Sequence, residues 1–475
     1  MKNCAKKIAC FVCAALMATT AIGLSACDED EVINAYDIAV QNGFVGTEQD
    51  WLLSLQGANG KDGEDLDIND LYEAAKQNGF DGTLLQFIQS LDIAVPENND
   101  TQTIAKNVTS VVSVCCAFEQ KRVVGNYWNQ YEETTVTGAE GSGVVVHIEK
   151  NRGVAYVVTN YHVIYNTSAG ISDCIWLYPY GARDTFTTGN SAQGIEPGDL
   201  AGGDGIQATF IGGAMDYDIA LLQINSADLP DSILTAAQFG DSNDITVGEK
   251  AFAIGNANGL GISATNGIIS VESEDIKMTS TDGLREVYYR VMRTDAAINH
   301  GNSGGGLFNA AGQLVGITNA KSVADETDNM GYALPITQVK YLLQNIWENK
   351  TEQGAGYVLR AFLGVETYIQ SSKAQLVDGK LHIQEEFVVS SILNNGAVGG
   401  NKAETLKVGD VFLSATLNGI TTVFSQRYHL NDFLLNVRKG DTVTFTVLRD
   451  GSVTGKVETQ VNVTFDKDEY FVKYA

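Results

Sequence analysis

Three polar residues beside apolar runs have the side-chain types needed to cut a peptide bond. His162 follows the run Val154 to Thr159, Asp218 directly precedes the run that begins at Ile219, and Ser303 stands among glycines. A serine hydroxyl is a weak nucleophile near neutral pH, so it needs a base within hydrogen-bond reach. A carboxylate must orient that base, and N–H groups must stabilise the developing oxyanion. The residue types therefore predict a Ser303 nucleophile, a His162 general base and an Asp218 that orients it.

The segment around Ser303 could supply the oxyanion donors. Residues 299–307 read Asn-His-Gly-Asn-Ser-Gly-Gly-Gly-Leu, and glycine allows the tight backbone that aims N–H groups at one point. Each feature is weak alone, because a lone histidine is more often structural than catalytic. Together, the histidine, the aspartate and the glycine-framed serine indicate peptide hydrolysis.

Short strands must position these residues. Between about 104 and 345 the chain has β-branched runs separated by turn residues, which are typical of a barrel or a sandwich. The runs are Val108 to Phe118, Gly143 to His147, Val154 to Thr159, Ile175 to Tyr178, Ile219 to Ile224 and Ala251 to Ile254. A helix is predicted from about Ile336 to Asn349, followed by a linker from Thr351 to Gly356.

The serine segment and its surroundings resemble the HtrA/Deg family of trypsin-like serine proteases. Thr-Asp-Ala-Ala-Ile-Asn at 294–299 and Gly-Asn-Ser-Gly-Gly at 301–305 carry the resemblance. Supporting matches are Gly141 to Val144, Thr159 to Val163, Asp218 to Leu222, Ala253 to Asn256, Thr265 to Ser270, Leu314 to Ile317 and Gly331 to Ile336. The resemblance implies a mainly β chain with a chymotrypsin-like double β-barrel protease domain at 100–350, and the order His, Asp, Ser agrees with that fold.

The resemblance also assigns backbone roles. The N–H groups of Gly301 and Ser303 would form the oxyanion hole. His300 replaces the family's usual proline, and Gly306 replaces a proline or an alanine. Neither change removes a catalytic group, but both could loosen the oxyanion loop.

A substrate pocket is expected beside the nucleophile, lined by Ala297, Thr318 and Ala320. Trypsin-like enzymes that cut after Arg or Lys carry an aspartate six residues before the nucleophile, and Ala297 occupies that position here. No buried carboxylate is offered to a basic side chain, so the expected preference is for small or medium apolar residues such as Val, Ala or Leu.

The C-terminal unit at 357–470 resembles the PDZ domains attached to these proteases. Phe362-Leu363-Gly364-Val365 follows Arg360 in the chain. Later matches are Leu406 to Ser414, Leu417 to Gly419 and Gly440 to Gly451. PDZ domains hold the terminal carboxylate of a peptide with backbone groups of such a loop, while the peptide adds to an open strand edge. Peptide C-termini are the expected partners, and an ordinary β-rich spacer is the alternative.

The first 27 residues are predicted to be a lipoprotein-type signal peptide. Three lysines precede an apolar stretch from Ile8 to Leu24, and Leu-Ser-Ala-Cys ends at Cys27. This ending resembles a bacterial lipobox, so Cys27 would be lipidated and would tether the chain to a membrane. The expected location is the outer face of the cytoplasmic membrane, on the periplasmic side if the cell has an outer membrane. Plain secretion with an unmodified Cys27 is the alternative.

Residues 28–95 contain two helical repeats with a period of 36 residues, joined by a glycine-polar linker. Asp65, Asp67 and Asn69 hint at a calcium loop. Lys76 stands where the bidentate glutamate belongs, so calcium is not expected. A spacer or a surface-attachment module is the expected role of this region.

Composition narrows the partners. The formal net charge is −27, which repels phosphate backbones and argues against nucleic-acid binding. The sequence implies no organic cofactor, and no metal-ligand spacing is present. Three cysteines remain after the signal segment, namely Cys115, Cys116 and Cys174. One bridge from Cys174 to either vicinal partner and three free thiols both stay open.

The expected function is an exported, membrane-tethered serine endopeptidase that cleaves unfolded or damaged exported proteins. The alternative is a catalytically silent peptide-binding scaffold, which the intact triad disfavours. An adhesin based on the N-terminal repeats would explain only the first hundred residues. Related proteases commonly assemble as homo-trimers, but the sequence gives no independent signal for that assembly.

Overall fold

The chain divides into two compact units, Met1–Ala94 and Val95–Ala475. The computed structural model describes residues 76, 100–126, 128–182, 204–225, 234–320, 330–352, 354–377, 379–399, 405–451 and 455–475. The signal segment, Cys27 and the helical repeats therefore lie outside the described residues, apart from Lys76, which is helical and exposed.

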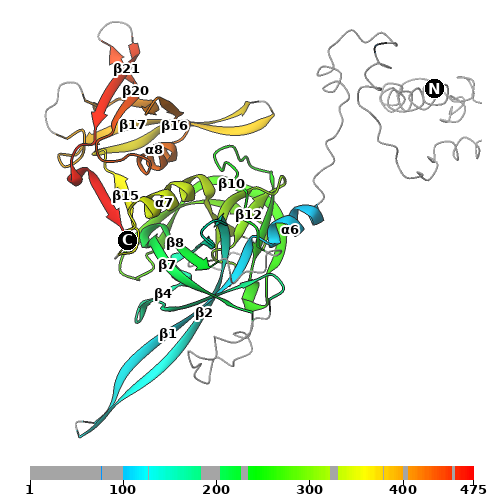
Figure 1. The fold of residues 1–475 in the computed structure, drawn as a ribbon. Coiled ribbons are helices and arrows are strands. Elements are labelled where there is room, and N and C mark those ends of the chain that lie inside the picture. The colour runs from blue at the N-terminus through cyan, green and yellow to red at the C-terminus, as the bar shows by residue number, and fades with distance from the viewer. Residues whose placement is uncertain are drawn as a thin grey trace, which may run out of the picture. The chain divides into compact units, whose positions relative to one another are not determined.

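The first barrel is closed and carries strands from both sides of the His162 segment (Figure 1). Its strands, in spatial order, are β1 (Val111–Asn126), β2 (Asn129–Glu149), β3 (Val154–Thr159), β8 (Ile219–Asn225), β7 (Ile206–Ala214) and β6 (Cys174–Pro179). The short pair β4 (Tyr165–Asn166) and β5 (Gly170–Ile171) lies outside it. The strand residues of one apolar core in this barrel are mostly valine, isoleucine, leucine and alanine, together with Cys116 and Phe118 of β1.

The second barrel is also closed. Its strands, in spatial order, are β10 (Ser263–Thr279), β11 (Glu286–Thr294), β14 (Gly331–Pro335), β13 (Leu314–Asn319), β12 (Gly306–Asn309) and β9 (Lys250–Gly255). Short 3-10 turns lie in the connections of both barrels: η1 (Tyr161–Val163) and η4 (Met215–Tyr217) in the first and η6 (Ala257–Gly259) in the second. Two closed barrels confirm the expected mainly β, chymotrypsin-like architecture.

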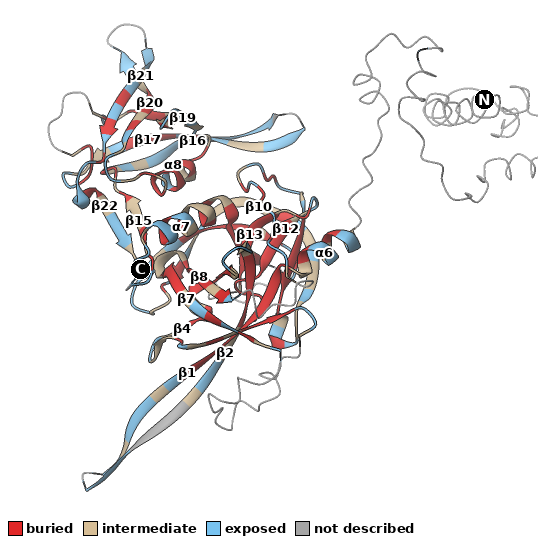
Figure 2. Ribbon diagram, viewed as in Figure 1, coloured by how far each residue is buried: buried red, intermediate tan, exposed pale blue. Residues whose placement is uncertain are grey.

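A two-stranded ribbon extends β1 and β2 far beyond the first barrel. Their register runs without a break from Val111↔Val144 to Asn126↔Asn129. The outer half of β1 is mostly exposed, so the ribbon lacks a buried face there (Figure 2). Because the prediction relied on apolar runs, it ended the first strand at Phe118 and began the second at Gly143, whereas β1 continues to Asn126 and β2 begins at Asn129.

Helices cover or flank the barrels. α6 (Asp100–Val108) precedes β1, and α7 (Ile336–Glu348) follows β14, close to the predicted helix at 336–349. Val339, Leu342 and Ile346 of α7 join a core that contains residues of both barrels. None of the helices in the described part of the chain is long and apolar enough to cross a membrane.

The C-terminal unit has its own core. Its main sheet follows the order β16 (Val365–Val377), β17 (Lys380–Ile392), β18 (Val411–Leu417), β20 (Thr442–Gly451) and β21 (Gly455–Thr464), with β19 (Ile420–Val423) paired to β18. A second, two-stranded sheet joins β15 (Val358–Ala361) to β22 (Phe471–Tyr474), which follows η7 (Asp468–Tyr470). One helix, α8 (Arg427–Leu434), packs Leu430, Phe433 and Leu434 against this core.

Candidate active site

Three irregular segments deliver the predicted catalytic side chains. His162 lies in η1, three residues after the end of β3. Asp218 lies between η4 and β8. Asp218 has a φ of 53°, a left-handed conformation that non-glycine residues adopt rarely. Ser303 lies in the loop between β11 and β12, so the site draws on both barrels.

The structure brings these three side chains into one hydrogen-bonded line. Nδ1 of His162 lies 2.7 Å from Oδ2 of Asp218, and Nε2 lies 2.9 Å from Oγ of Ser303. The backbone N–H of His162 also donates to Oδ1 of Asp218 at 2.9 Å. Asp218 is 0% exposed and Ser303 5%. A carboxylate held by two bonds to one histidine fixes both the position and the tautomer of that imidazole.

Two further side chains that the sequence reasoning missed hold Asp218. The amide of Asn319 donates to Oδ2 at 2.8 Å, and the hydroxyl of Thr281 donates to Oδ1 at 3.4 Å. Burial and then the negative charge of Asp218 raise the pKa of the nearby Tyr289. Asn319 ends β13, and a polar residue at the end of an apolar strand is the signal that could have found it.

The loop that contains Ser303 presents two backbone donors. Among the described residues, the N–H groups of Gly301 and Ser303 have no hydrogen-bond acceptor. Gly301 has a φ of +88°, and a Cβ there would lie 2.1 Å from the carbonyl oxygen of Asn256. Only glycine fits this position, because both the dihedral and the contact exclude a side chain. The hydroxyl of Ser303 accepts from the N–H of Ala320 at 3.0 Å, which leaves its proton for His162.

His300 and Gly306, which depart from the family pattern, both make defined contacts in the structure. The carbonyl of His300 accepts from the N–H of Asn258 at 2.6 Å, so this residue is anchored through its backbone. At Gly306, an added Cβ would lie 2.4 Å from the ring of Phe308. A side chain at Gly306 would therefore require the buried ring of Phe308 to shift.

The predicted pocket residues take different positions. Ala297 is exposed, and its carbonyl accepts from the hydroxyl of Thr265 at 2.9 Å. Thr318 is fully buried, and its hydroxyl donates to the carbonyl of Asn302 at 2.5 Å. Ala320 contacts Ser303 through its N–H, while residues 321–329 lie outside the described part of the chain. No carboxylate stands at position 297 to receive a basic side chain.

The predicted carboxylate-binding loop of the C-terminal unit points its carbonyls at the segment 393–398. The carbonyls of Phe362, Leu363 and Gly364 accept from the N–H groups of Ala397, Val398 and Leu393, at 3.1, 3.0 and 2.8 Å respectively. The carbonyl and the N–H of one trans peptide point in opposite directions. The N–H groups that share a peptide with these carbonyls therefore face away from the segment 393–398. Those of Leu363 and Gly364 have no acceptor among the described residues.

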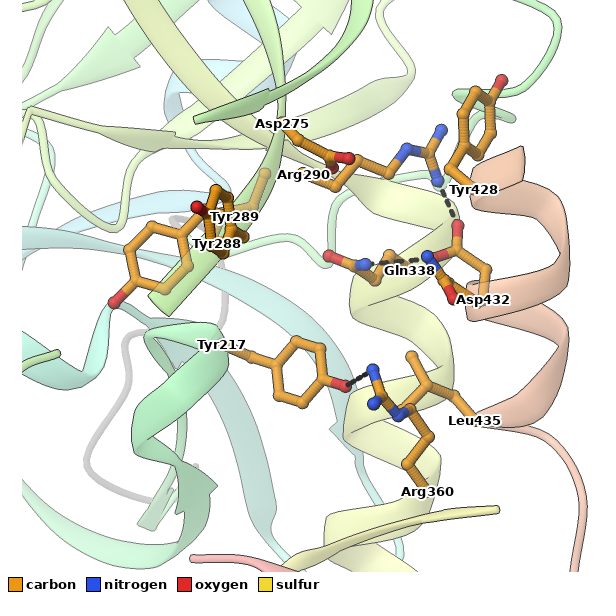
Figure 3. Close-up of a pocket in the computed structure, with 12 residues that line it drawn as sticks. Tyr217, Asp275, Tyr288, Tyr289, Arg290, Gln338, Arg360, Tyr428, Asp432 and Leu435 are labelled. Atoms are coloured by element: carbon orange, nitrogen blue, oxygen red, sulfur yellow. Dashed lines mark hydrogen bonds and ion pairs between the residues drawn. The ribbon is translucent and has the colours of Figure 1, made fainter. Parts of the chain in front are cut away.

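A polar cavity of about 160 Å³ lies where β11 of the second barrel and α7 meet α8 of the C-terminal unit (Figure 3). Arg290 of β11 and Asp432 of α8 form a buried ion pair across it, and Gln338 donates to the same carboxyl at 2.9 Å. Burial raises the pKa of Asp432, against the opposing effect of Arg290. These contacts fix α8 on the second barrel.

Metal and disulfide chemistry find no support in the described residues. They contain no group of three or more His, Cys, Asp or Glu side chains that could hold a metal ion. Cys116 is buried and Cys174 half-buried, and no disulfide joins these two thiols. Burial raises the pKa of Cys116, which makes it an inert, protonated thiol.

Comparison with known proteins identifies serine proteases as relatives of this chain. Residues 141–317 match the model of the trypsin-like peptidase domain. A serine protease Do-like HtrA of Lactococcus lactis subsp. cremoris is 30% identical over 386 residues, which are 77% of this chain and 84% of that protein. The periplasmic serine endoprotease DegP of Escherichia coli is 32% identical over 69% of this chain and 56% of its own length. Among solved structures, the HtrA-type protease AlgW with a tripeptide is 27% identical, with a TM-score of 0.44 over 76% of this chain and 95% of that one.

Proposed function

The chain belongs to the HtrA family of trypsin-like serine proteases and is a serine endopeptidase, and from this premise we propose that Ser303, His162 and Asp218 form its catalytic triad. The observation that carries the proposal is the unbroken hydrogen-bonded line from Asp218 Oδ2 through both ring nitrogens of His162 to Ser303 Oγ. A serine, an imidazole and a buried carboxylate in this order form an activated nucleophile.

In the acylation step, Ser303 Oγ attacks the carbonyl carbon of the scissile bond while its proton passes to Nε2 of His162. The oxyanion that forms accepts hydrogen bonds from the N–H groups of Gly301 and Ser303. His162 then gives its proton to the leaving nitrogen as the C–N bond breaks. Asp218 stabilises the imidazolium through Nδ1 without taking its proton.

In the second step, water hydrolyses the acyl-enzyme. His162 takes a proton from the water as its oxygen attacks the ester carbon. The ester C–O bond breaks, and Ser303 Oγ recovers a proton from His162. A proton from water thus replaces the one that Ser303 lost to the leaving amine in the acylation step.

Casein digestion by the wild type and by Ser303→Ala tests this assignment. The wild type should digest casein, and the variant should lose nearly all of that activity while keeping its thermal unfolding temperature. Equal activity of the two proteins would remove Ser303 from the mechanism. Inactivity of both would favour a peptide-binding scaffold that keeps the fold.

The substrate class proposed for this site is unfolded or damaged exported protein, cut after small or medium apolar residues. Ala297 supports the second part, because it leaves no carboxylate where a basic side chain would need one. Digestion of a peptide library should therefore give mostly Val, Ala and Leu on the acyl side. A digest dominated by cleavage after Arg or Lys would overturn this specificity.

A PDZ-type role of the C-terminal unit forms a second part of the proposal. Peptide C-termini would bind at Phe362 to Val365, where the N–H groups of Leu363 and Gly364 face away from the supporting turn. β16, which follows directly, pairs only with β17 among the described strands, so its other edge can accept a peptide strand. A fluorescent peptide with an apolar, free C-terminus should bind, and the same peptide with an amidated terminus should bind at least tenfold more weakly. Equal binding would exclude carboxylate recognition.

We place the protein at the outer face of the cytoplasmic membrane, tethered by lipid at Cys27. The Leu-Ser-Ala-Cys ending of the signal segment supports this placement. Cys27→Ala should move the protein from the membrane fraction to the soluble fraction, and mass spectrometry of the mature N-terminus should show acyl chains only in the wild type. An unmodified Cys27 in membrane-bound protein would contradict the tether.

A further inference from the structure

Ser142, a buried residue of β2 in the first barrel, contacts the nucleophile loop of the second barrel at two points. Its hydroxyl donates to the carbonyl of Gly301 at 2.6 Å, and its backbone N–H donates to the carbonyl of Ser303 at 2.7 Å. The same hydroxyl accepts from the N–H of Asn256 at 2.8 Å. One residue therefore links the first barrel to the end of β9 and to both residues expected to stabilise the oxyanion.

The other carbonyls of the loop are bound as well. The N–H of Asn258 holds the carbonyl of His300, and the hydroxyl of Thr318 holds the carbonyl of Asn302. Carbonyl and N–H of one trans peptide point in opposite directions. Binding at the carbonyls of His300 and Asn302 therefore turns the N–H groups of Gly301 and Ser303 the other way, where the described residues offer them no acceptor.

Each bond acts on a defined part of the loop. The Asn258 bond sets the plane that carries the Gly301 N–H. The Ser142 hydroxyl holds the next plane, that of the 301–302 peptide, and so restrains the Cα of Gly301 about which the 300–301 peptide would turn. Since Gly301 has the permissive backbone of glycine, only external bonds keep its N–H turned outward.

We propose that Ser142 is a positioning residue for the oxyanion hole: its hydroxyl holds the Gly301 carbonyl and so keeps the Gly301 N–H directed at the reacting carbonyl. This inference rests on the proposed triad mechanism and adds to it a residue that touches neither substrate nor nucleophile side chain.

Ser142→Ala tests the inference cleanly, because the substitution removes the hydroxyl and leaves the backbone bond to Ser303. With a fluorogenic peptide substrate, kcat should fall about 10- to 100-fold while KM stays within twofold, since the bond matters for the oxyanion and not for substrate binding. A peptide aldehyde of the same sequence, whose tetrahedral adduct carries the oxyanion, should lose affinity by a similar factor.

Thr159→Val is the matched control. Its hydroxyl donates to the carbonyl of the same Ser142 at 2.7 Å but has no bond to Gly301. Ser142→Ala loses the bond to Gly301 and the bond from Asn256, and Thr159→Val loses one buried bond, so both variants should unfold at a lower temperature, and only Ser142→Ala should lose kcat. Equal losses of kcat in the two variants, or an unchanged kcat and aldehyde affinity in Ser142→Ala, would overturn the inference. An inactive wild type would instead sink the proposed function together with it.

Discussion

The amide of Asn319 donates to Oδ2 of Asp218, the same oxygen that accepts from Nδ1 of His162. Asn319 comes from the end of β13 in the second barrel, whereas Asp218 precedes β8 in the first. The carboxylate that orients the histidine is thus held from both barrels.

Asn319→Leu should lower kcat by about 10- to 100-fold, because a hydrogen bond to a charged group contributes about 1.5–3 kcal/mol. Steady-state kinetics with a peptide substrate measures the loss. Thr281→Val is the graded control, since its hydroxyl lies 3.4 Å from Oδ1 and should matter less. A larger loss in Thr281→Val than in Asn319→Leu would contradict the ranking of these two donors.

Asp218→Asn should lower kcat by about 10⁴-fold, as expected when an amide favours the wrong tautomer of the histidine. Thermal unfolding checks that the fold is retained. Adding Asp218→Asn to Ser303→Ala should have little further effect on activity, because members of one catalytic unit are not additive. Additive losses would argue against a shared mechanism.

Gly301→Ala should cost about 100-fold or more in kcat. Its Cβ would meet the carbonyl oxygen of Asn256 at 2.1 Å and push the oxyanion loop away. Gly440→Ala is the matched control, because Gly440 has a similar φ of +98° and no atom within 4 Å of the added Cβ. The control should lose about 1 kcal/mol of stability and keep kcat. Comparable kinetics of the two variants would refute the role of the contact.

His429 in α8 should make the fold less stable in mild acid. Burial, and then the charge of Arg290, lowers its pKa from 6.5 to about 4. Between these values the unfolded chain takes up a proton and the folded chain does not. Stability is therefore full above pH 6.5 and falls by up to about 3 kcal/mol as the pH drops to 4. Urea unfolding at several pH values should show a shallower decline in His429→Gln than in wild type. Parallel curves would show that other groups cause it.

Arg290→Met should destabilise the attachment of α8 by about 3–5 kcal/mol, because it leaves Asp432 buried without its counter-charge. The double variant Arg290→Met with Asp432→Leu should recover most of this loss, since paired apolar side chains fill the same space. Denaturant unfolding of the four proteins of this cycle gives the coupling. A double variant as unstable as the sum of the single ones would contradict a direct buried pair.

The parts of the fold that the sequence predicted well are those with a buried face. β3 has the predicted bounds Val154–Thr159, and α7 ends within a residue of its prediction. In both, apolar side chains meet a core, so hydrophobic periodicity reports the structure directly. The outer part of the β1–β2 ribbon has no core to meet, and cross-strand hydrogen bonds alone define it.

The candidate site also has residues that could be predicted from the sequence and residues that could not. The three residues of the proposed triad could be predicted because their side-chain types are rare in that combination and stand beside apolar runs. Ser142 could not, because its role arises from a backbone carbonyl that approaches from the other barrel. Asn319 stands at the end of an apolar run, but its partner, the carboxylate of Asp218, comes from the other barrel and cannot be identified from that run alone. A serine in Gly-Ser-Gly carries no sign in sequence of which carbonyl its hydroxyl will bind.

The hydrogen-bonded carbonyls of Phe362, Leu363 and Gly364 have a consequence for how the C-terminus of a bound peptide would be recognised. Amide donors do not titrate and are present in every sequence, so the receptor for a terminal carboxylate would survive changes of pH, of salt and of most side chains. Affinity for a chain end would therefore be nearly constant, and selectivity among different ends would have to evolve in the side chains along β16 and α8.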